Sequence, residues 1–293
     1  MFYKTKEDIT NRPLVSVVIP TFNAERTLEK CLLSLINQTY RNLEIIIVDK
    51  FSSDHTVDIA KMYGAKVYFH PGPERTSQVN YGVKMASGEI IYYIGADFVL
   101  DKNLIEKAVR KMLEDNSDGV KIPNLAVGYT FWGKCRALEK LMNIGEDIIE
   151  VPRFMKKNVF LKLRGYDEKL IGGEEWDLGI RFEKYGYSAT RITEVAEWHI
   201  DEPQDLKKII LRALYYGSSV YGYIRKNPLR ATVQYLPIRI FWLRKWRKYV
   251  KSPLFLFGLI FMKNLEYFSG LIGKILLFKK YYKEVNIRNQ KHK

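Results

Sequence analysis

The stretch that decides the fold is VSVVIPTFNAERTLEKCLLSLINQTYRNLEIIIVDKFSSDHT, residues 15–56. It opens with a β-branched run that ends at a proline and closes with a second apolar run that stops at Asp49. Continuous Val and Ile runs are typical of parallel strands buried on both faces, so we predict strands over residues 15–20 and 43–48. Apolar residues at helical spacing between these runs predict a helix over residues 27–38.

The same alternation of strand-like and helix-like segments continues downstream. Strands that alternate with helices of this length indicate an α/β domain with a Rossmann-like, mainly parallel sheet flanked by helices. Ligands of such sheets bind at the carboxyl ends of the strands. The further predicted strands are residues 65–69 and 89–94, and the further predicted helices are residues 56–63, 79–86 and 102–114.

Charge is unevenly distributed along the chain. The net charge is +15, but residues 205–293 hold 20 Lys and Arg against three Asp and Glu, a local net of +17. Such asymmetry indicates an anionic partner, either lipid headgroups or nucleic acid. A solvated basic face is the simpler alternative, although aromatic residues are threaded through these charges.

Other regions carry weaker signals. Cys31 and Cys135 are far apart and lack metal-ligand spacing, so we expect two free thiols. Residues 1–11 are charged and lack the apolar core of a signal peptide. Residues 123–150 show no clear periodicity, and we predict no regular element there.

Two aspartates follow predicted strands at the edge where ligands bind. A carboxylate at Asp49 could accept a hydrogen bond from the ring N–H of a nucleobase, and the alternative is a turn that caps the next helix. Asp97 could hold a divalent cation against a diphosphate, because hard cations take oxygen ligands, and its alternative is a turn aspartate. The lone His199 is a further candidate ligand, although a single histidine is more often structural.

A cluster of acidic residues stands before a predicted amphipathic helix, in the sequence GGEEWDL of residues 172–178. Crowding carboxylates together costs electrostatic repulsion, and a general base suits such an arrangement. Acidic residues also favour a helix N-terminus through the helix dipole, which is the alternative for Asp177. Glu174 and Glu175 are therefore the catalytic candidates.

Four segments in this order and spacing resemble the inverting family 2 glycosyltransferases, which have the GT-A fold. Each motif is loose alone, but the four together are specific, and they cover roughly residues 1–225. The segments are residues 15–56, SQVNYGVKMASGEIIYYIGADFVL of residues 77–100, LRGYDEKLIGGEEWDLGIRFEKYGY of residues 163–187, and DLKKIILRALYYGSSVYGYIR of residues 205–225.

The resemblance implies a role for each matched position. Asp97 matches the second aspartate of the DxD motif, a ligand of Mg²⁺ or Mn²⁺, and His199 stands where relatives place a metal or diphosphate ligand. Glu175 matches the base that deprotonates the acceptor, beside Glu174. The implied donor-binding residues are Pro20, Thr21, Phe22, Asn23, Glu25 and Asp49, and the implied acceptor region is Gly172, Gly173 and Trp176. Arg75, Asn80 and Ala96 are further candidates for donor contact, and the alternative for Arg75 and Asn80 is a surface loop.

Two positions depart from the family pattern. The first aspartate of DxD is Gly95 here, which predicts a thinner metal site. The acidic pair reads Glu174-Glu175, so the base stands on a side chain one methylene longer than aspartate.

The C-terminal region mixes basic and aromatic residues. Its longest charge-free run, residues 252–262, is eleven residues long, and a spanning helix needs about 20 apolar residues, so we do not predict an ordinary transmembrane helix. Trp242, Trp246 and Tyr249 alternate with basic residues, which is typical of helices lying in a headgroup layer. The alternatives are a helical subdomain packed on the catalytic domain, an oligomer interface, or an inserted hairpin of residues 253–262 and 268–278.

We therefore expect a catalytic domain over residues 1–225 and a membrane-associating helical region over residues 226–293, peripheral or monotopic on the cytoplasmic face of the cell membrane. The expected reaction moves a sugar from a nucleotide-sugar donor to a hydroxyl or phosphate of a lipid-linked or polyprenyl-phosphate acceptor. A sugar-phosphate nucleotidyltransferase is the first alternative. A basic nucleic-acid-binding protein is the second, disfavoured because the GGEEWD cluster would repel phosphates.

Overall fold

The computed structural model describes residues 12–72, 74–236, 239, 242, 245 and 252–290. These residues form two compact units, and each is described by itself. Among the described residues, the first unit holds residues 12–123, 152–166 and 178–200. The second holds the described residues of the ranges 124–151, 167–177 and 201–290.

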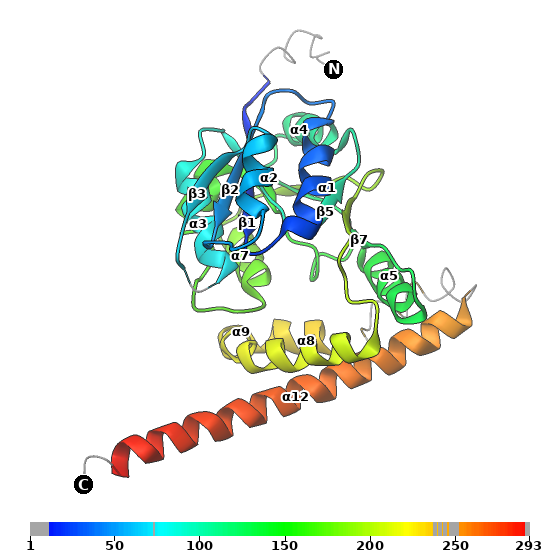
Figure 1. Cartoon of the computed structure of the whole chain (residues 1–293). Helices are drawn as coiled ribbons and strands as arrows, with labels where there is room; N and C mark the ends of the chain where they lie inside the picture. The colour runs from blue at the N-terminus through cyan, green and yellow to red at the C-terminus, as the bar shows by residue number, and fades with distance from the viewer. Residues whose placement is uncertain are drawn as a thin grey trace. The chain divides into compact units, whose positions relative to one another are not determined.

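A seven-stranded sheet of order β3-β2-β1-β4-β8-β6-β9 forms the centre of the first unit (Figure 1). The neighbours of β1 and β2 pair in parallel, whereas β8 pairs antiparallel with β4 and with β6. The predicted strands are thus confirmed as the parallel half of the sheet. The strands are β1 (Val15–Thr21), β2 (Leu43–Asp49), β3 (Lys66–Phe69), β4 (Ile90–Tyr93), β6 (Gly119–Lys121), β8 (Phe154–Lys156) and β9 (Ala189–Arg191).

Helices cover both faces of this sheet, because β1 directs apolar residues to each side. Val15, Val17 and Ile19 belong to one buried cluster with α1 and α4, and Val18 belongs to a second cluster with α3 and the later part of α7. The helices are α1 (Glu25–Ile36), α2 (Thr56–Met62), α3 (Arg75–Met85), α4 (Leu104–Glu114), α6 (Lys157–Lys162) and α7 (Glu174–Lys184).

The register of the strands aligns their carboxyl ends. Thr21 lies opposite Asp49, and Asp49 lies opposite Phe69, so β1, β2 and β3 end side by side. A separate antiparallel pair, β5 (Phe98–Leu100) with β10 (Glu197–His199), sets His199 opposite Phe98. Backbone pairing in the main sheet therefore fixes the position of Asp49, and the pairing of β5 with β10 fixes that of His199.

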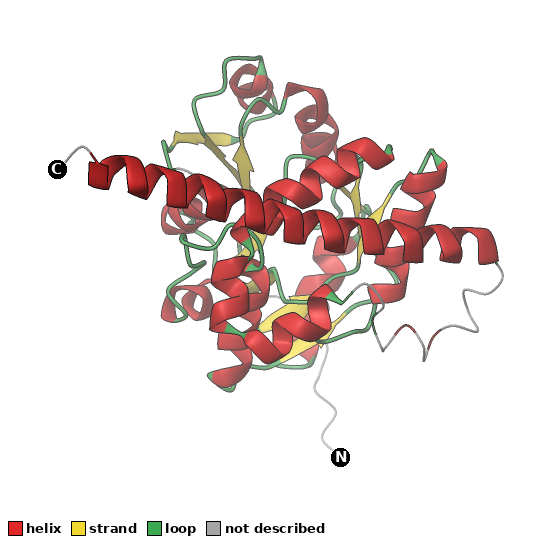
Figure 2. Ribbon diagram, turned by 90° about the horizontal axis from the view of Figure 1, so that it is seen from below, coloured by secondary structure: helices red, strands yellow, loops and turns green. Residues whose placement is uncertain are grey.

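The second unit is mainly helical. Its longest helix, which ends at the C label in Figure 2, packs along α8 and α5. A buried cluster of Cys135, Met142, Ile209, Leu259 and Met262 lies between these helices. The elements are β7 (Asn124–Ala126), α5 (Phe131–Asn143), α8 (Leu206–Ser219), α9 (Tyr221–Lys226), α10 (Pro228–Tyr235) and α12 (Pro253–Gln290).

For the C-terminal region, the structure rules out one alternative, and one prediction is wrong. Residues 253–290 form one continuous helix, so the hairpin of residues 253–262 and 268–278 does not exist. Trp242 is buried, with its ring N–H donating to Asn143, and Lys245 donates to the Ile144 carbonyl; both therefore face α5 and not a headgroup layer. Trp246 and Tyr249, which belonged to the same prediction, lie outside the described residues.

One segment of α12 is long and apolar enough to cross a membrane. By length and composition alone, Pro253–Gly273 qualifies as a span, which the count of charge-free residues did not predict. The region over residues 123–150, for which no element was predicted, contains β7 and α5. Both cysteines are buried free thiols, as expected.

Candidate active site

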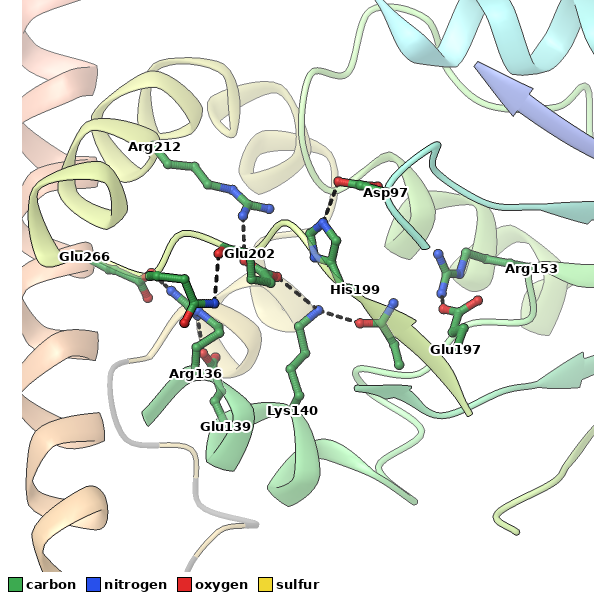
Figure 3. A network of polar contacts seen from close by, with 12 residues as sticks. Asp97, Arg136, Glu139, Lys140, Arg153, Glu197, His199, Glu202, Arg212 and Glu266 are labelled. Atoms are coloured by element: carbon green, nitrogen blue, oxygen red, sulfur yellow. Dashed lines mark hydrogen bonds and ion pairs between the residues drawn. The ribbon is translucent and has the colours of Figure 1, made fainter. Parts of the chain in front are cut away.

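Asp97 and His199 are brought together in the first unit from positions 102 residues apart. Asp97 lies between β4 and β5, and its Oδ2 is 2.6 Å from Nε2 of His199 (Figure 3). The ladder between β5 and β10 fixes this contact, and the Ile200 N–H donates to the Asp97 carbonyl. The His199 side chain is largely buried, whereas that of Asp97 is about one-third exposed. Asp97 is therefore the more accessible member of the pair.

Aromatic and charged residues hold the His199 ring from behind. The ring stacks on Phe98, with centroids 4.7 Å apart and planes within 3°. The Arg153 guanidinium lies over the Phe98 ring at 5.4 Å and forms an ion pair with Glu197 (Figure 3). Glu197 is fully buried and accepts a hydrogen bond from Tyr92 at 2.7 Å. Burial raises the pKa of Tyr92, so its hydroxyl stays a donor.

Gly95 stands in place of the first aspartate of the DxD motif, and a side chain here would require Asp97 to move. A Cβ atom at this position would lie 2.5 Å from Asp97 Oδ1 and 3.1 Å from the Phe98 ring. The observed conformation of Asp97 therefore depends on the glycine, and the site has one carboxylate where the family pattern has two.

These residues fit a divalent cation only with ligands from elsewhere. No group of three or more His, Cys, Asp or Glu that could hold a metal occurs among the described residues. Asp97 and His199 supply one oxygen and one nitrogen, and Mg²⁺ and Mn²⁺ sites commonly use one or two protein ligands with phosphate oxygens and water. The donor set therefore suits a cation that arrives with a diphosphate.

Asp49 ends β2 and is fully buried. Its carboxylate accepts hydrogen bonds from Thr21 Oγ1 at 2.6 Å and from both the N–H and the hydroxyl of Ser52 at 2.7 Å. Gln78 donates to the carbonyls of Thr21 and Val48 below it. The carboxylate thus organises the loop at the end of the strand, and its contact with a nucleobase stays a prediction.

The loops after β1 and β2 are joined to each other. Asn23 accepts from the Ser53 N–H through Oδ1 and donates its own N–H to Ser52. Glu25, at the start of α1, accepts from the His55 N–H at 3.0 Å. Phe22, in the same loop, is 58% exposed, and Lys50 Nζ lies 5.6 Å from its ring centroid. The predicted donor loop is therefore well ordered, with an aromatic ring directed to solvent.

The other predicted donor residues have varied surroundings. The amide of Asn80 donates to the Tyr166 carbonyl and accepts from its N–H, so it braces the chain where the acceptor loop begins. Ala96 is buried in the core, Pro20 lies within β1, and Arg75 is an exposed residue that opens α3.

The acidic cluster and its two glycines belong to the second unit. Gly172 and Gly173 have φ values of 100° and 78°, a region that favours glycine, and a Cβ on Gly173 would meet the Tyr223 ring at 2.6 Å. Trp176 donates its ring N–H to Ile149 and packs near Tyr223. This tight turn starts α7 at Glu174.

The three acids of this turn differ in their partners. Glu174 is buried and accepts from the Gly172 N–H at 3.0 Å. Asp177 is buried and lies 2.7 Å from Lys226 Nζ. Glu175 is partly exposed, and among the described residues no hydrogen bond or ion pair holds its carboxylate. The available carboxylate is therefore the one that the sequence predicts as the base.

Sequence reasoning missed the residues that support His199. Glu197 lies two residues before His199 on a strand, which places both on one face, and this spacing could have identified it. Arg153 precedes a strand of only three residues and carries no such signal. Asp101, which accepts from the Trp198 ring N–H and the Ala196 N–H, was also missed.

The mainly parallel sheet and the Asp97–His199 pair at its ligand-binding edge define a GT-A-like α/β protein, as predicted. Residues 16–161, about half of the chain, match the family described as glycosyl transferase family 2. These residues form a glycosyl transferase family 2 domain, and the chain belongs to that family.

Known proteins extend this assignment. An uncharacterized glycosyltransferase from Haemophilus influenzae is 32% identical over 114 residues, which cover 36% of this chain and 45% of the relative. The match thus spans less than half the length of that curated relative.

Two solved structures share the fold. The mannosyltransferase PcManGT from Pyrobaculum calidifontis, in complex with GDP-Man and Mn²⁺, has a TM-score of 0.66 at 16% identity, covering 91% of this chain and 88% of that chain. TarS from S. aureus, in complex with UDP-GlcNAc, has a TM-score of 0.55 at 15% identity, covering 91% and 92%. At such identities the likeness establishes the fold alone.

Proposed function

We propose that this protein is a nucleotide-sugar-dependent glycosyltransferase that inverts the configuration of the transferred sugar. The observation that carries the proposal is the Asp97–His199 contact at the edge of a family 2 domain. Ligands of open α/β sheets bind at the carboxyl ends of the strands, and the oxygen and nitrogen of this pair suit a diphosphate-bound cation.

Glu175 is the general base of the proposed reaction. Its carboxylate takes the proton of the acceptor hydroxyl, whose oxygen attacks the anomeric carbon from the face opposite the leaving group. The bond from that carbon to the diphosphate breaks, and the nucleoside diphosphate leaves with the electron pair. Support comes from the partners of Glu174 and Asp177, which are engaged in a hydrogen bond and an ion pair, whereas no such partner holds Glu175 among the residues that the structure describes.

Asp97 and His199 hold the divalent cation, Mg²⁺ or Mn²⁺. When bound, the cation neutralises the charge that develops on the departing diphosphate. Arg153 and Glu197 keep the His199 ring in place through Phe98, so a change at either should disturb cation binding without touching the ligands. The two solved neighbours carry GDP-Man with Mn²⁺ and UDP-GlcNAc, which is consistent with a nucleotide-sugar donor of either base.

The acceptor is a lipid-linked sugar or polyprenyl phosphate, and the protein works on the cytoplasmic face of the cell membrane. This location rests on the local net charge of +17 over residues 205–293 and on the apolar segment Pro253–Gly273. Each basic residue near an anionic surface contributes about 1 kcal/mol of attraction.

A thermal-stabilisation screen of nucleotide sugars, with and without Mn²⁺, tests the donor and the cation together. We expect one nucleotide sugar to raise the melting temperature, and to do so more strongly with Mn²⁺. Asp97→Asn should remove the Mn²⁺-dependent part while leaving the melting temperature of the free protein within a few degrees. No stabilisation by any nucleotide sugar would refute the proposal.

The reaction products separate the proposal from its main alternative. A glycosyltransferase releases nucleoside diphosphate, whereas a sugar-phosphate nucleotidyltransferase releases pyrophosphate. Proton NMR of the anomeric centre in the product then tests inversion, since retention of the donor configuration would contradict the proposed single displacement.

A further inference from the structure

Helix α12 exposes a continuous apolar face. Phe257 is 72% exposed, Phe268 is 58% exposed and Ile275 is 55% exposed. Exposed apolar residues recur along the helix at intervals of three, four and seven, which places them in one stripe. The residues of this outward face are Leu254, Phe257, Phe261, Phe268, Leu271, Ile272 and Ile275.

The charged residues within Pro253–Gly273 face the other way. Lys263 lies 3.0 Å from Glu139 of α5 and 2.8 Å from Glu266 of its own helix. Arg136 of α5 pairs with both Glu139 and Glu266 (Figure 3). Lys263 and Glu266 are only 14% and 17% exposed. The two charges that interrupt the apolar sequence are therefore neutralised inside the second unit.

The inward face of α12 is occupied by protein along the same segment. A Cβ on Gly258 would lie 2.6 Å from the Phe131 ring of α5, and a Cβ on Gly273 would lie 2.2 Å from the Leu214 carbonyl of α8. Between these points Leu259 and Met262 are fully buried. Lipid cannot surround this helix unless the charged residues of α5 enter the hydrocarbon as well, which is costly.

We propose that α12 lies in the plane of an anionic bilayer, with its outward face inserted into the edge of the hydrocarbon and its axis parallel to the membrane. This inference rests on the membrane location proposed above and names the part of the chain that contacts lipid. In-plane helices bury one apolar face by about 5–10 Å and keep their charges out of the hydrocarbon. The basic character of residues 205–293 provides the complementary charge for anionic headgroups.

Depth-dependent quenching distinguishes an in-plane helix from a spanning one. Phe257→Cys, Phe268→Cys and Ile275→Cys are each labelled with an environment-sensitive fluorophore in the full chain. The native thiols do not compete, because Cys31 and Cys135 are buried and burial raises the pKa of Cys135 to about 11. Vesicles of phosphatidylcholine with about 30 mol % phosphatidylglycerol carry spin labels at a shallow or a deep acyl position.

The two orientations predict different profiles. In the plane, all three sites are quenched more strongly by the shallow label, to a similar extent. In a spanning helix, residues 257 and 275 would be about 27 Å apart along the membrane normal, and residue 268 would be quenched most by the deep label. Dominant deep quenching at residue 268 therefore overturns the proposal, as does the absence of quenching at all three sites.

Charge substitutions give an independent measure. The double variant Phe257→Asp/Phe268→Asp should lower partitioning into these vesicles by at least about tenfold, because two exposed rings no longer enter the hydrocarbon. Leu113→Asp places one aspartate at an exposed apolar residue of α4, away from α12, and should change partitioning little. Equal partitioning of the double variant and the control would contradict the inference.

Failure of this inference can be told apart from failure of the proposed function. Release of nucleoside diphosphate, assayed with a water-soluble acceptor and no vesicles, should be the same in the double variant and the unmodified protein. A protein that transfers sugar but shows no lipid quenching refutes only the in-plane helix. A protein that shows the quenching profile but transfers no sugar refutes only the proposed activity.

Discussion

The two units of this protein distribute polar and apolar residues in opposite ways. The first unit buries Val, Ile and Leu on both faces of a sheet and gathers its functional acids at the strand ends. The second unit buries a network of Arg136, Glu139, Lys263 and Glu266 between helices and exposes aromatic and aliphatic residues on α12. The second unit therefore combines buried ion pairs, beside its buried apolar cluster, with exposed apolar side chains on α12, and the membrane contact proposed above would account for that exposure.

Two carboxylates, one from each unit, differ in burial and in hydrogen bonding. Asp49 is fully buried with three internal donors, and it organises a loop. Glu175 is partly exposed and has no hydrogen-bond or ion-pair partner among the described residues. The first arrangement stabilises a loop, whereas the second leaves the carboxylate accessible, as the base of the proposed reaction requires.

The largest expected effect is on turnover. Glu175→Gln keeps the shape of the side chain but cannot accept a proton, so turnover should fall by about 10²–10⁴-fold. The matched control is Glu183→Gln, near the other end of α7 and exposed, for which we expect turnover within about twofold of the unmodified protein. Both are measured by nucleoside diphosphate release. Similar rates for the two variants would exclude Glu175 as the base.

The next effect is on the stability of the second unit. Glu139→Gln removes the carboxylate that faces Lys263 and Arg136, and a buried ion pair that loses one partner costs about 3–5 kcal/mol. Chemical unfolding followed by tryptophan fluorescence measures this, since Trp132, Trp176 and Trp242 all belong to the second unit. A loss below about 1 kcal/mol would show that the network is not stabilising.

The same network predicts sensitivity to acid. Burial alone would raise the pKa of Glu139, but Lys263 and Arg136 outweigh it and hold that pKa well below its ordinary value of 4.5. The pKa of Glu266 is lowered in the same way. The unfolded chain therefore binds protons first, and stability is lost as the pH falls below about 4.5, by up to about 1.4 kcal/mol per pH unit for each group.

Melting temperatures measured between neutral pH and pH 3 by tryptophan fluorescence check this dependence. In Glu139→Gln the melting temperature should fall less steeply with decreasing pH, because one of the two carboxyl groups of this network with a lowered pKa is gone. If the melting temperature of that variant falls with pH as steeply as that of the unmodified protein, other carboxylates cause the loss of stability in acid.

A smaller effect is expected where α8 and α12 cross. A Cβ on Gly217 would lie 2.3 Å from the Gly270 carbonyl, so Gly217→Ala forces the helices apart and should cost about 1–3 kcal/mol. Gly64→Ala, at a position open in space but with φ of 73°, is the contrasting control for backbone strain alone. Thermal unfolding of both variants checks the difference, and an equal loss would mean that the close crossing contributes nothing.

The parallel half of the sheet could be predicted because its strands are continuous apolar runs that end at polar residues. The same signal located Asp49 and Asp97, since the carboxyl ends of parallel strands meet at one edge. Strands β6, β8 and β9 could not be found in this way, because a strand of three residues is too short to show a period.

The second unit was harder to predict for two physical reasons. Glycines such as Gly270 and Gly273 weaken the prediction of a continuous helix, yet here they allow α12 to approach α8 closely. The segment for which a hairpin was the alternative is one helix. Arg136 and Glu266 are 130 residues apart, and local patterns contain no information on such a pairing. In the sequence Lys263 and Glu266 interrupt an apolar run, whereas in the structure they form ion pairs with Glu139 and Arg136 of α5.

The backbone conformation of Phe51 is strained, and its side chain is not buried in the core. Its φ of 56° lies in the left-handed region, which costs a bulky residue about 1–2 kcal/mol. Its ring is 60% exposed and stacks on the exposed ring of Phe69, with the centroids 5.4 Å apart. Phe51→Asn should leave the melting temperature almost unchanged, whereas a typical core phenylalanine loses about 3–5 kcal/mol on truncation. If the proposed nucleotide-sugar donor binds at the end of β2, the exposed ring of Phe51, two residues after Asp49, offers a flat surface on which a nucleobase would stack.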